Sequence, residues 1–231
     1  MGINVELIKV NNGRYDVSII KNDEYIGRTI ACGYEWDGWM RTDIQANYKP
    51  GTDIIDIGAN IGYNTLMFSD YGYVHAFEPV YHEIVKINVK NNNLKNGVHV
   101  YSFALSNERK FSNIYLPNIE HSKNGLLNYG GTGLTASDTA IPFPVPCERL
   151  DDVYSGTPSI IKIDVEGHEL QTLQGAINTI KKHKPMLMVE IYNFSEDDPV
   201  HKFIKELGYE DPQERPEWMF LYRAKDIFST M

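Results

Sequence analysis

The stretch Asp53-Ile54-Ile55-Asp56-Ile57-Gly58-Ala59-Asn60-Ile61-Gly62 predicts a short buried β-strand that runs directly into the start of a helix. Its glycines let a ligand approach the backbone, and the helix start offers unbonded N–H groups. The GxxxG spacing fits neither the GxGxxG dinucleotide motif nor the GxxxxGK phosphate loop. Asp56 at the strand tip would repel a pyrophosphate. We therefore expect a ligand with a positively charged amino-acid part.

Outward from this stretch, short apolar runs alternate with amphipathic stretches. Further strands are expected at residues 73–77, 98–103, 160–163, 186–191 and 218–222, the last as an antiparallel edge strand. The spacing of apolar residues predicts helices over residues 80–94, 170–180 and 200–207, the last capped by Gly208. Strands that alternate with helices are typical of an α/β fold with a mostly parallel sheet.

Two segments depart from this alternation. Residues 1–46 contain a predicted hairpin, with strands at 5–10 and 15–20 around Asn12-Gly13, and then an aromatic cluster at 34–39. We expect these residues to form a small β-rich cap, and residues 47–231 to form the main domain. Residues 108–148 are rich in glycine and proline and are expected to be a strand and loop insertion, because long loops in compact domains are usually functional.

Composition narrows the class of partner. The chain has 231 residues and a formal net charge of −9, without a basic block. Nucleic acid is not expected as a partner, because clustered Lys and Arg supply most of the affinity for it. The sequence contains neither an apolar run long enough to span a membrane nor a secretory signal, and Cys32 and Cys147 lack a CxxC spacing. These features predict a folded protein of the reducing cytoplasm, with its oligomeric state open.

Acidic residues follow two of the predicted strands. Glu78 lies about 20 residues after the glycines, where a carboxylate can accept hydrogen bonds from both hydroxyls of a ribose. Asp164, Glu166, His168 and Glu169 follow the strand at 160–163. Because open α/β sheets bind ligands at their carboxyl edge, we expect these groups to share one site. Capping of the following helix is the alternative for part of the second cluster, Glu169 above all.

Together these motifs resemble the FkbM family of class I S-adenosylmethionine-dependent methyltransferases. The resemblance covers roughly residues 45–225 and is carried by DIGANIGYNT (56–65), HAFEP (75–79), FALSN (103–107), IKIDVEGHELQTLQGA (161–176) and KPMLMVEI (184–191). It implies a Rossmann-like fold with a mostly parallel seven-stranded sheet and helices on both faces. It also implies methyl transfer to an oxygen, with a hydroxyl of a sugar or glycan as the expected acceptor and S-adenosylhomocysteine as the product.

The resemblance also implies where the cofactor is held. Its methionyl part would contact Asp56, Gly58, Asn60 and Gly62, with Thr65 on the adjacent helix; the ribose would be held by Glu78, and the adenine flanked by Ala104 and Ser106. Asp164 would face the methionyl amine or the reacting centre.

Transfer to a hydroxyl needs a group that removes its proton. The candidate bases are Asp164, Glu166, His168 and Glu190. His168 has the ordinary pKa closest to neutrality, about 6.5, but the family often has an apolar or aromatic residue there, so we place it below the carboxylates. A divalent metal is possible but not favoured, and its ligands would be Asp164, Glu190 and Asn193.

Recognition of the acceptor is assigned to aromatic and polar side chains. The candidates are Tyr34, Trp36, Trp39, Tyr129 and Tyr192, which would stack on a sugar face, and Asn193, which would bind its hydroxyls. The 108–148 insertion is expected near this acceptor site. The alternative for the tryptophans is packing within the cap.

Four other functions stay open at this point. The acceptor could be a small polyketide-like or other natural product, or the chain could be a domain that binds S-adenosylmethionine without catalysis. An RNA methyltransferase would need a basic groove, which the charge of −9 disfavours. A nicotinamide-dependent dehydrogenase would need a third glycine in the GxGxxG register.

Overall fold

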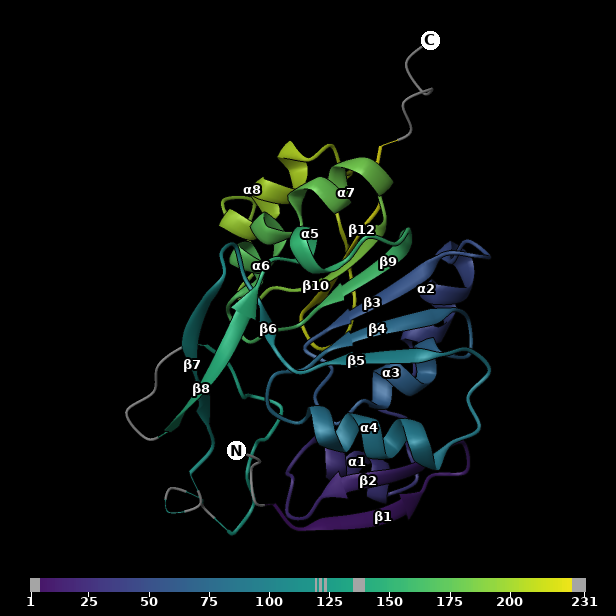
Figure 1. The fold of residues 1–231 in the computed structure, drawn as a ribbon, viewed down its shortest axis with the longest axis vertical. Helices are drawn as coiled ribbons and strands as arrows, with labels where there is room; N and C mark the ends of the chain where they lie inside the picture. The colour runs from purple at the N-terminus through teal and green to yellow at the C-terminus, as the bar shows by residue number, and fades with distance from the viewer. Residues whose placement is uncertain (1–4, 119, 121, 123, 135–139, 226–231) are drawn as a thin grey trace.

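The computed structural model describes residues 5–118, 120, 122, 124–134 and 140–225, and its centre is a seven-stranded sheet (Figure 1). In spatial order the strands are β11 (Gln213–Glu214), β12 (Met219–Tyr222), β10 (Met186–Glu190), β9 (Pro158–Ile163), β3 (Asp53–Ile57), β4 (Tyr73–Phe77) and β5 (Val98–Tyr101). Neighbours from β10 to β5 are parallel, whereas β12 runs antiparallel to β10. The sheet confirms the predicted α/β class.

The final predicted strand is present, but its expected place at the edge was wrong. β12 pairs with β10 on one side and with β11 on the other. The turn between β11 and β12 contains Glu217 and Trp218, both in the left-handed region with φ of 58° and 54°. A two-residue strand has no hydrophobic period, so the sequence held no signal for β11.

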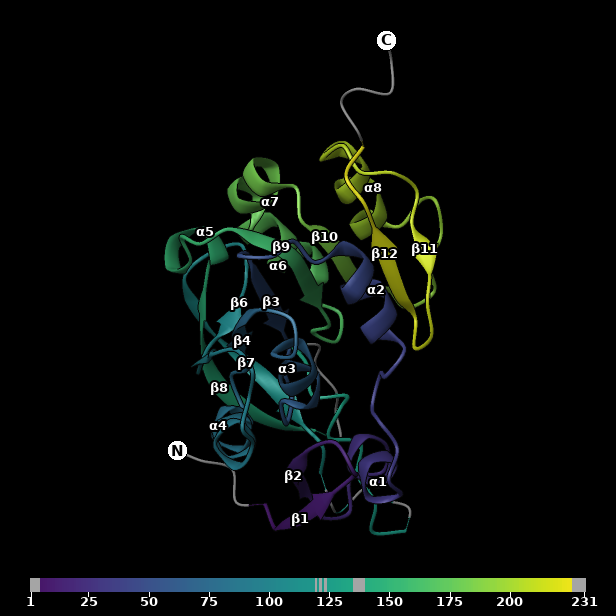
Figure 2. The same cartoon turned by 90° about the vertical axis from the view of Figure 1, so that its right-hand side faces the viewer.

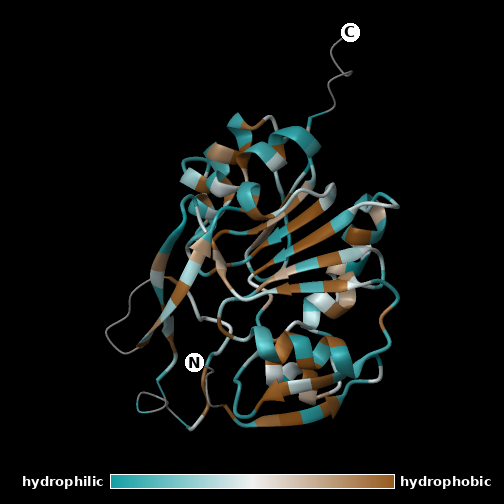
Figure 3. Cartoon of the chain, viewed as in Figure 1, coloured by the Kyte–Doolittle hydropathy of each residue, from teal (hydrophilic) through white to brown (hydrophobic). Residues whose placement is uncertain are grey.

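Helices cover both faces of the sheet because its inner strands are apolar on both sides (Figures 2 and 3). One face, with Ile55, Ile57 and Ile161, packs against α5 (Leu150–Val153), α6 (Glu169–Gly175), α7 (Ile177–His183) and α8 (Pro199–Glu206). The other face packs against α2 (Met40–Asn47), α3 (Tyr63–Phe68) and α4 (His82–Asn91). None of the described helices is both long and apolar enough to cross a membrane.

Two elements differ in extent from the prediction. The strand expected at 98–103 ends at Tyr101, and the chain then forms the short strand β6 (Ala104–Leu105) in a second sheet. The helix expected at 170–180 is divided into α6 and α7 at Ala176. A Cβ on Gly175 would lie 2.0 Å from the carbonyl oxygen of Ser106. Only a glycine allows this close approach. The break between α6 and α7 therefore lies next to a tight contact with Ser106, which is distant in the sequence.

The N-terminal segment combines the expected hairpin with two helices. β1 (Leu7–Asn11) and β2 (Asp16–Ile20) pair as predicted, and the side chain of Asn88 on α4 accepts from Ser18 N. α1 (Ile26–Ala31) and α2 follow, and α2 crosses residue 46, the expected limit of the cap. These helices are short and have no side-chain N-cap hydrogen bond. They therefore lack the start signals by which a sequence reveals a helix.

The 108–148 insertion forms most of a second, three-stranded sheet. β7 (Lys110–Leu116) and β8 (Ile141–Glu148) are antiparallel, and β6 pairs with the end of β8. Prolines occupy positions 142, 144 and 146 of β8, alternating with residues that pack inward. Alternate residues direct their nitrogens to one side, so prolines there need not interrupt the pairing with β7.

Candidate functional site

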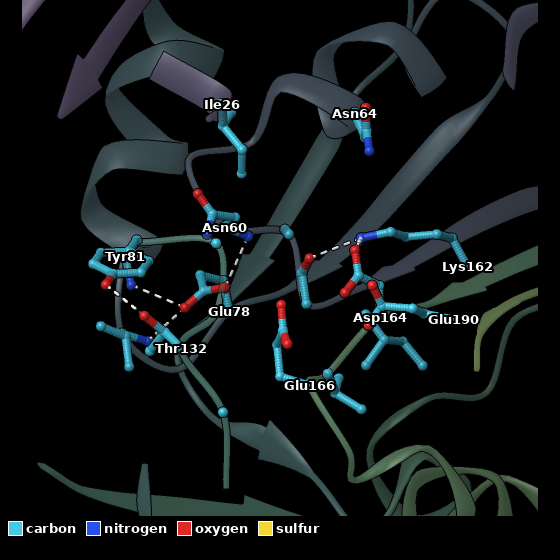
Figure 4. A pocket seen from close by; sticks show the side chains of 18 of the residues that line it. Ile26, Asn60, Asn64, Glu78, Tyr81, Thr132, Lys162, Asp164, Glu166 and Glu190 are labelled. Atoms are coloured by element: carbon cyan, nitrogen blue, oxygen red, sulfur yellow. Dashed lines mark hydrogen bonds and ion pairs between the residues drawn. The ribbon is translucent and has the colours of Figure 1, made fainter. Parts of the chain in front are cut away.

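A cavity of about 400 Å³ lies at the carboxyl ends of β3, β4, β9 and β10 (Figure 4). Parallel strands bring these ends to one edge of the sheet, where open α/β folds bind ligands. The predicted residues that line the cavity are Trp36, Gly58, Asn60, Glu78, Ala104, Asp164, Glu166, Glu190 and Tyr192. The predicted residues outside its lining are Tyr34, Trp39, Asp56, Gly62, Thr65, Ser106, Tyr129, His168 and Asn193.

The glycines after β3 bring backbone segments into close contact. Gly58 has φ of 78°, and a Cβ there would lie 1.7 Å from the carbonyl oxygen of Asp164. Gly62 has φ of 86° and packs against Val85 on α4, away from the cavity. Both positions require glycine, but only Gly58 exposes its backbone to the ligand space.

A buried ion pair joins the cavity wall to the residues behind it, since Lys162 lines the cavity and Asp56 does not. Asp56 and Lys162 are cross-strand partners on β3 and β9, and Lys162 Nζ lies 3.6 Å from Asp56 Oδ1. Lys162 Nζ also lies 3.1 Å from Asp164 Oδ2 and donates to the carbonyl oxygen of Gly58 at 2.9 Å. Thr65 on α3 donates to Asp56 Oδ2 at 2.5 Å. Asp56 and Thr65 therefore support the wall from behind.

Lys162 was missed by the sequence analysis. Burial opposes charge on its ammonium, yet the carboxylates of Asp164 and Asp56 raise its pKa above the ordinary value. The available signal was a lysine inside an otherwise apolar strand, since charged side chains are almost never fully buried unless paired. Of its partners, Asp164 lies two residues further along the chain, whereas Asp56 and Gly58 come from β3 and the loop after it.

Glu78 lies at the side of the cavity opposite Lys162 (Figure 4). Its Oε2 accepts from Asn60 N at 2.8 Å, and its Oε1 accepts from Val80 N and Tyr81 N at 2.8 and 3.0 Å. Burial raises the pKa of this carboxyl to about 7, although the backbone N–H groups oppose the shift. A carboxylate oxygen can accept two hydrogen bonds, so Oε2 retains capacity for a ligand hydroxyl.

Three carboxylates converge near Lys162. Ligand oxygens of Asp164, Glu166 and Glu190 lie within 4.8 Å of one another. Burial, and then the nearby Asp164, raise the pKa of Glu166 to about 7 and that of Glu190 to about 10. Tyr192 donates its hydroxyl to Glu166 Oε2 at 3.2 Å. The three carboxylates are partly buried and repel one another. Binding of a proton or another cation by this group is therefore favoured.

His168 and Ser106 face each other outside the cavity. His168 Nε2 lies 3.0 Å from Ser106 Oγ, and burial lowers the pKa of the imidazole to about 4.

Two predicted acceptor-binding residues also lie outside the cavity lining. Tyr34 is 69% exposed, and Asn193 is also exposed. Glu169 accepts hydrogen bonds from Val165 N and Gly167 N at the start of α6. This matches the alternative interpretation, in which Glu169 caps the helix and does not bind the ligand.

The cavity lining also includes Asp37, Asn64 and Trp218, which sequence patterns did not single out. Trp218 lines the cavity and lies against Tyr192, with ring centroids 5.1 Å apart. Asp37 accepts from Asn64 Nδ2 at 2.9 Å, and burial raises the pKa of its carboxyl to about 6. These residues come from the N-terminal segment, α3 and the β11–β12 turn, so only folding brings them together.

Part of the 108–148 insertion passes over the cavity. Asn60 Nδ2 donates to the carbonyl oxygen of Tyr129 at 3.1 Å, and the hydroxyls of Tyr81 and Thr132 lie 2.9 Å apart. Asp23 accepts from Tyr129 N at 3.4 Å. Residues 128 and 130–134 therefore form one wall of the ligand space.

Comparisons with known proteins show similarities of sequence and of fold. A family model described as the methyltransferase FkbM domain matches residues 56–210. Methyltransferase sdnD of Sordaria araneosa is 27% identical over 216 residues, which cover 80% of this chain and 82% of that protein.

Two solved structures share the fold. Methyltransferase FkbM from Methylobacillus flagellatus aligns with a TM-score of 0.51 and 20% identity, over 75% of this chain and 43% of that one. Trm5b from Pyrococcus abyssi aligns with a TM-score of 0.51 and 11% identity, over 96% of this chain and 57% of that one. The chain thus spans less than half of the first structure.

Proposed function

The chain belongs to the FkbM family of S-adenosylmethionine-dependent methyltransferases, and on this basis we propose that it methylates a hydroxyl of a sugar or glycan in the cytoplasm. The observation that carries the proposal is one cavity lined by Glu78 on one side and by Asp164, Glu166 and Glu190 on another. A nucleoside with a charged amino-acid tail and a polar acceptor would fit between them.

The cofactor would lie along the carboxyl ends of β3 and β4. Glu78 Oε2 would accept a ribose hydroxyl, and the backbone of Gly58 and Asn60 would contact the methionyl part. Ala104 would flank the adenine. Asp56, Gly62, Thr65 and Ser106 would act as positioning residues, since they lie outside the lining.

When bound, S-adenosylmethionine would supply an activated methyl group for the acceptor oxygen, with S-adenosylhomocysteine as the leaving product. The chain must then align the acceptor with the methyl group and take the hydroxyl proton. Asp164, Glu166 and Glu190 line the cavity and are the candidate proton acceptors, whereas His168 lies outside its lining.

The acceptor would enter between Trp36 and the Tyr192–Trp218 pair. Aromatic faces and nearby carboxylates are the usual combination at sites for polyhydroxy ligands. Of the described lining residues, six carry carboxylates and Lys162 alone is cationic, which argues against RNA as the acceptor.

Cofactor affinity should depend on pH through Glu78. Its carboxyl has a pKa of about 7, and ribose hydroxyls donate to the ionised form. The ionised fraction rises from about one tenth at pH 6 to about nine tenths at pH 8, so calorimetry should show S-adenosylhomocysteine binding up to about tenfold tighter at pH 8. Glu78→Gln should flatten the profile. A wild-type affinity that is constant across this range would contradict the role of Glu78.

The acceptor class is tested with a labelled methyl donor. The chain would be incubated with labelled S-adenosylmethionine and deoxysugars, nucleotide sugars, polyketide-like alcohols or RNA, and products would be analysed by mass spectrometry and NMR. We expect label in an O-methyl ether of a sugar. Label only in a non-sugar alcohol would overturn the acceptor class, and cofactor binding without any transfer would indicate a non-catalytic domain.

A further inference from the structure

We propose that Asp37 and Asn64 bind the α-ammonium group at the amino-acid end of S-adenosylmethionine. Both residues line the cavity, and Asn64 Nδ2 donates to Asp37 Oδ2 at 2.9 Å. Figure 4 shows Asn64 on the same side as Lys162, whereas Glu78, the proposed ribose ligand, lies on the other side. The two ends of the cofactor would therefore bind at opposite sides of the cavity.

Asn64 provides the observation that points to a ligand. The residue is 6% exposed, and its Oδ1 is buried without a hydrogen-bond partner among the described residues. A buried amide oxygen without a donor is costly, because the solvation it loses is not replaced. Since Asn64 belongs to the cavity lining, a donor on a bound ligand would satisfy this oxygen.

Asp37 supplies the charge of the site. Its Oδ1 accepts from Trp39 Nε1 at 3.3 Å and its Oδ2 accepts from Asn64, so each oxygen retains capacity for a further donor. The two side chains therefore offer a ligand only acceptors, one of them a carboxylate. A hydroxyl has one donor and no charge, whereas an ammonium group has three donors and a positive charge. The pair thus fits an ammonium group better than it fits a hydroxyl of the acceptor.

The N-terminal segment fixes the position of Asp37. This residue has φ of 51°, and its carbonyl oxygen accepts from Met40 N at 2.9 Å, at the start of α2. Aspartate adopts the left-handed region more readily than most residues. Residue 37 also precedes residue 56, where the match to the FkbM domain begins. The segment before the matched domain would therefore contribute a contact to the cofactor.

Asp164 is the residue that the sequence analysis placed near this ammonium group. Its Oδ2 already lies 3.1 Å from Lys162 Nζ, and a second cation beside that ammonium would be repelled. Asp37 forms no ion pair with a described residue, although Lys162 acts on its carboxyl at longer range. The charge of Asp37 is therefore more available to the ligand than that of Asp164.

The site is tested by calorimetry with two ligands, S-adenosylhomocysteine and its analogue that keeps the carboxylate but lacks the α-amino group. The measurements are made at pH 7, because burial raises the pKa of Asp37 to about 6. Wild type should bind S-adenosylhomocysteine about tenfold to 100-fold tighter than the analogue, as expected for hydrogen bonds to a charged group. Asp37→Asn and Asn64→Leu should each reduce this ratio by about fivefold or more.

Asp16→Asn is the matched control. Asp16 also lies in the N-terminal segment and accepts from Asn11 Nδ2 at 2.9 Å, but it is outside the cavity lining. Its loss should leave the ratio of the two affinities unchanged. Circular dichroism verifies folding, and the nearly isosteric Asp37→Asn decides the outcome if Asn64→Leu does not fold.

The proposal is overturned if wild type binds both ligands equally or binds neither. It is also overturned if Asp37→Asn weakens both ligands by the same factor, because a purely structural role would have that effect. The inference rests on the cofactor of the family and not on the proposed acceptor. No acceptor takes part in these measurements, so a failure of sugar methylation would leave the ratio of affinities as it is.

Discussion

Replacing Lys162 with methionine should lower the free energy of unfolding by about 3–5 kcal/mol. Asp56 is fully buried, and Lys162 is the cation paired with it at 3.6 Å. The substitution also removes the donor to the carbonyl oxygen of Gly58. Methionine fills similar space, so the loss would come from an uncompensated charge and not from a cavity. Guanidinium unfolding followed by circular dichroism measures the effect.

The double variant Asp56→Asn/Lys162→Met is the control for this interpretation. Removing both charges should recover a large part of the lost stability, because no unpaired charge remains buried.

The single variant Lys162→Met should also become less stable as pH rises from 5 to 8. Burial already raises the pKa of Asp56, and loss of the ammonium raises it further. The folded state then binds more protons than the unfolded state, so stability falls with pH. A change below about 1 kcal/mol would show that the pair is not needed.

Replacing Glu78 with alanine should weaken S-adenosylhomocysteine binding by about 100-fold or more. Hydrogen bonds to a charged acceptor contribute about 1.5–3 kcal/mol each, and about 1.4 kcal/mol corresponds to tenfold in affinity. The substitution also releases Asn60 N, Val80 N and Tyr81 N, which Glu78 now orders. Isothermal calorimetry gives the affinity, and a thermal melt reports any loss of folding.

Glu83→Gln is the matched control for Glu78. Glu83 lies in the first turn of α4, and its side chain is 67% exposed. It shares the charge of Glu78 but lies outside the cavity lining, so its loss should leave affinity unchanged. Glu78→Gln should fall between wild type and Glu78→Ala, because it keeps one acceptor oxygen. Binding by Glu78→Ala within about threefold of wild type would exclude the ribose contact.

Much of the site could be anticipated because it is made of strand ends. The acidic residues Glu78, Asp164 and Glu190 each lie within one residue of the end of a predicted parallel strand, and parallel strands end at one edge. By contrast, Ser106 and His168 also lie near strand ends but contact each other outside the cavity lining. Sequence position shows which edge a residue is near, whereas packing decides which way its side chain turns.

The sequence alone determined the α/β class, the glycine loop after β3 and the acidic edge, because each depends on local period and chain direction. Only the tertiary structure decided that Lys162 pairs with Asp56, that Trp218 lies against Tyr192 and that two helices are separated at Ala176. These features join residues distant in the chain. Their energies arise from burial and charge pairing, which exist only after the strands and helices have packed together.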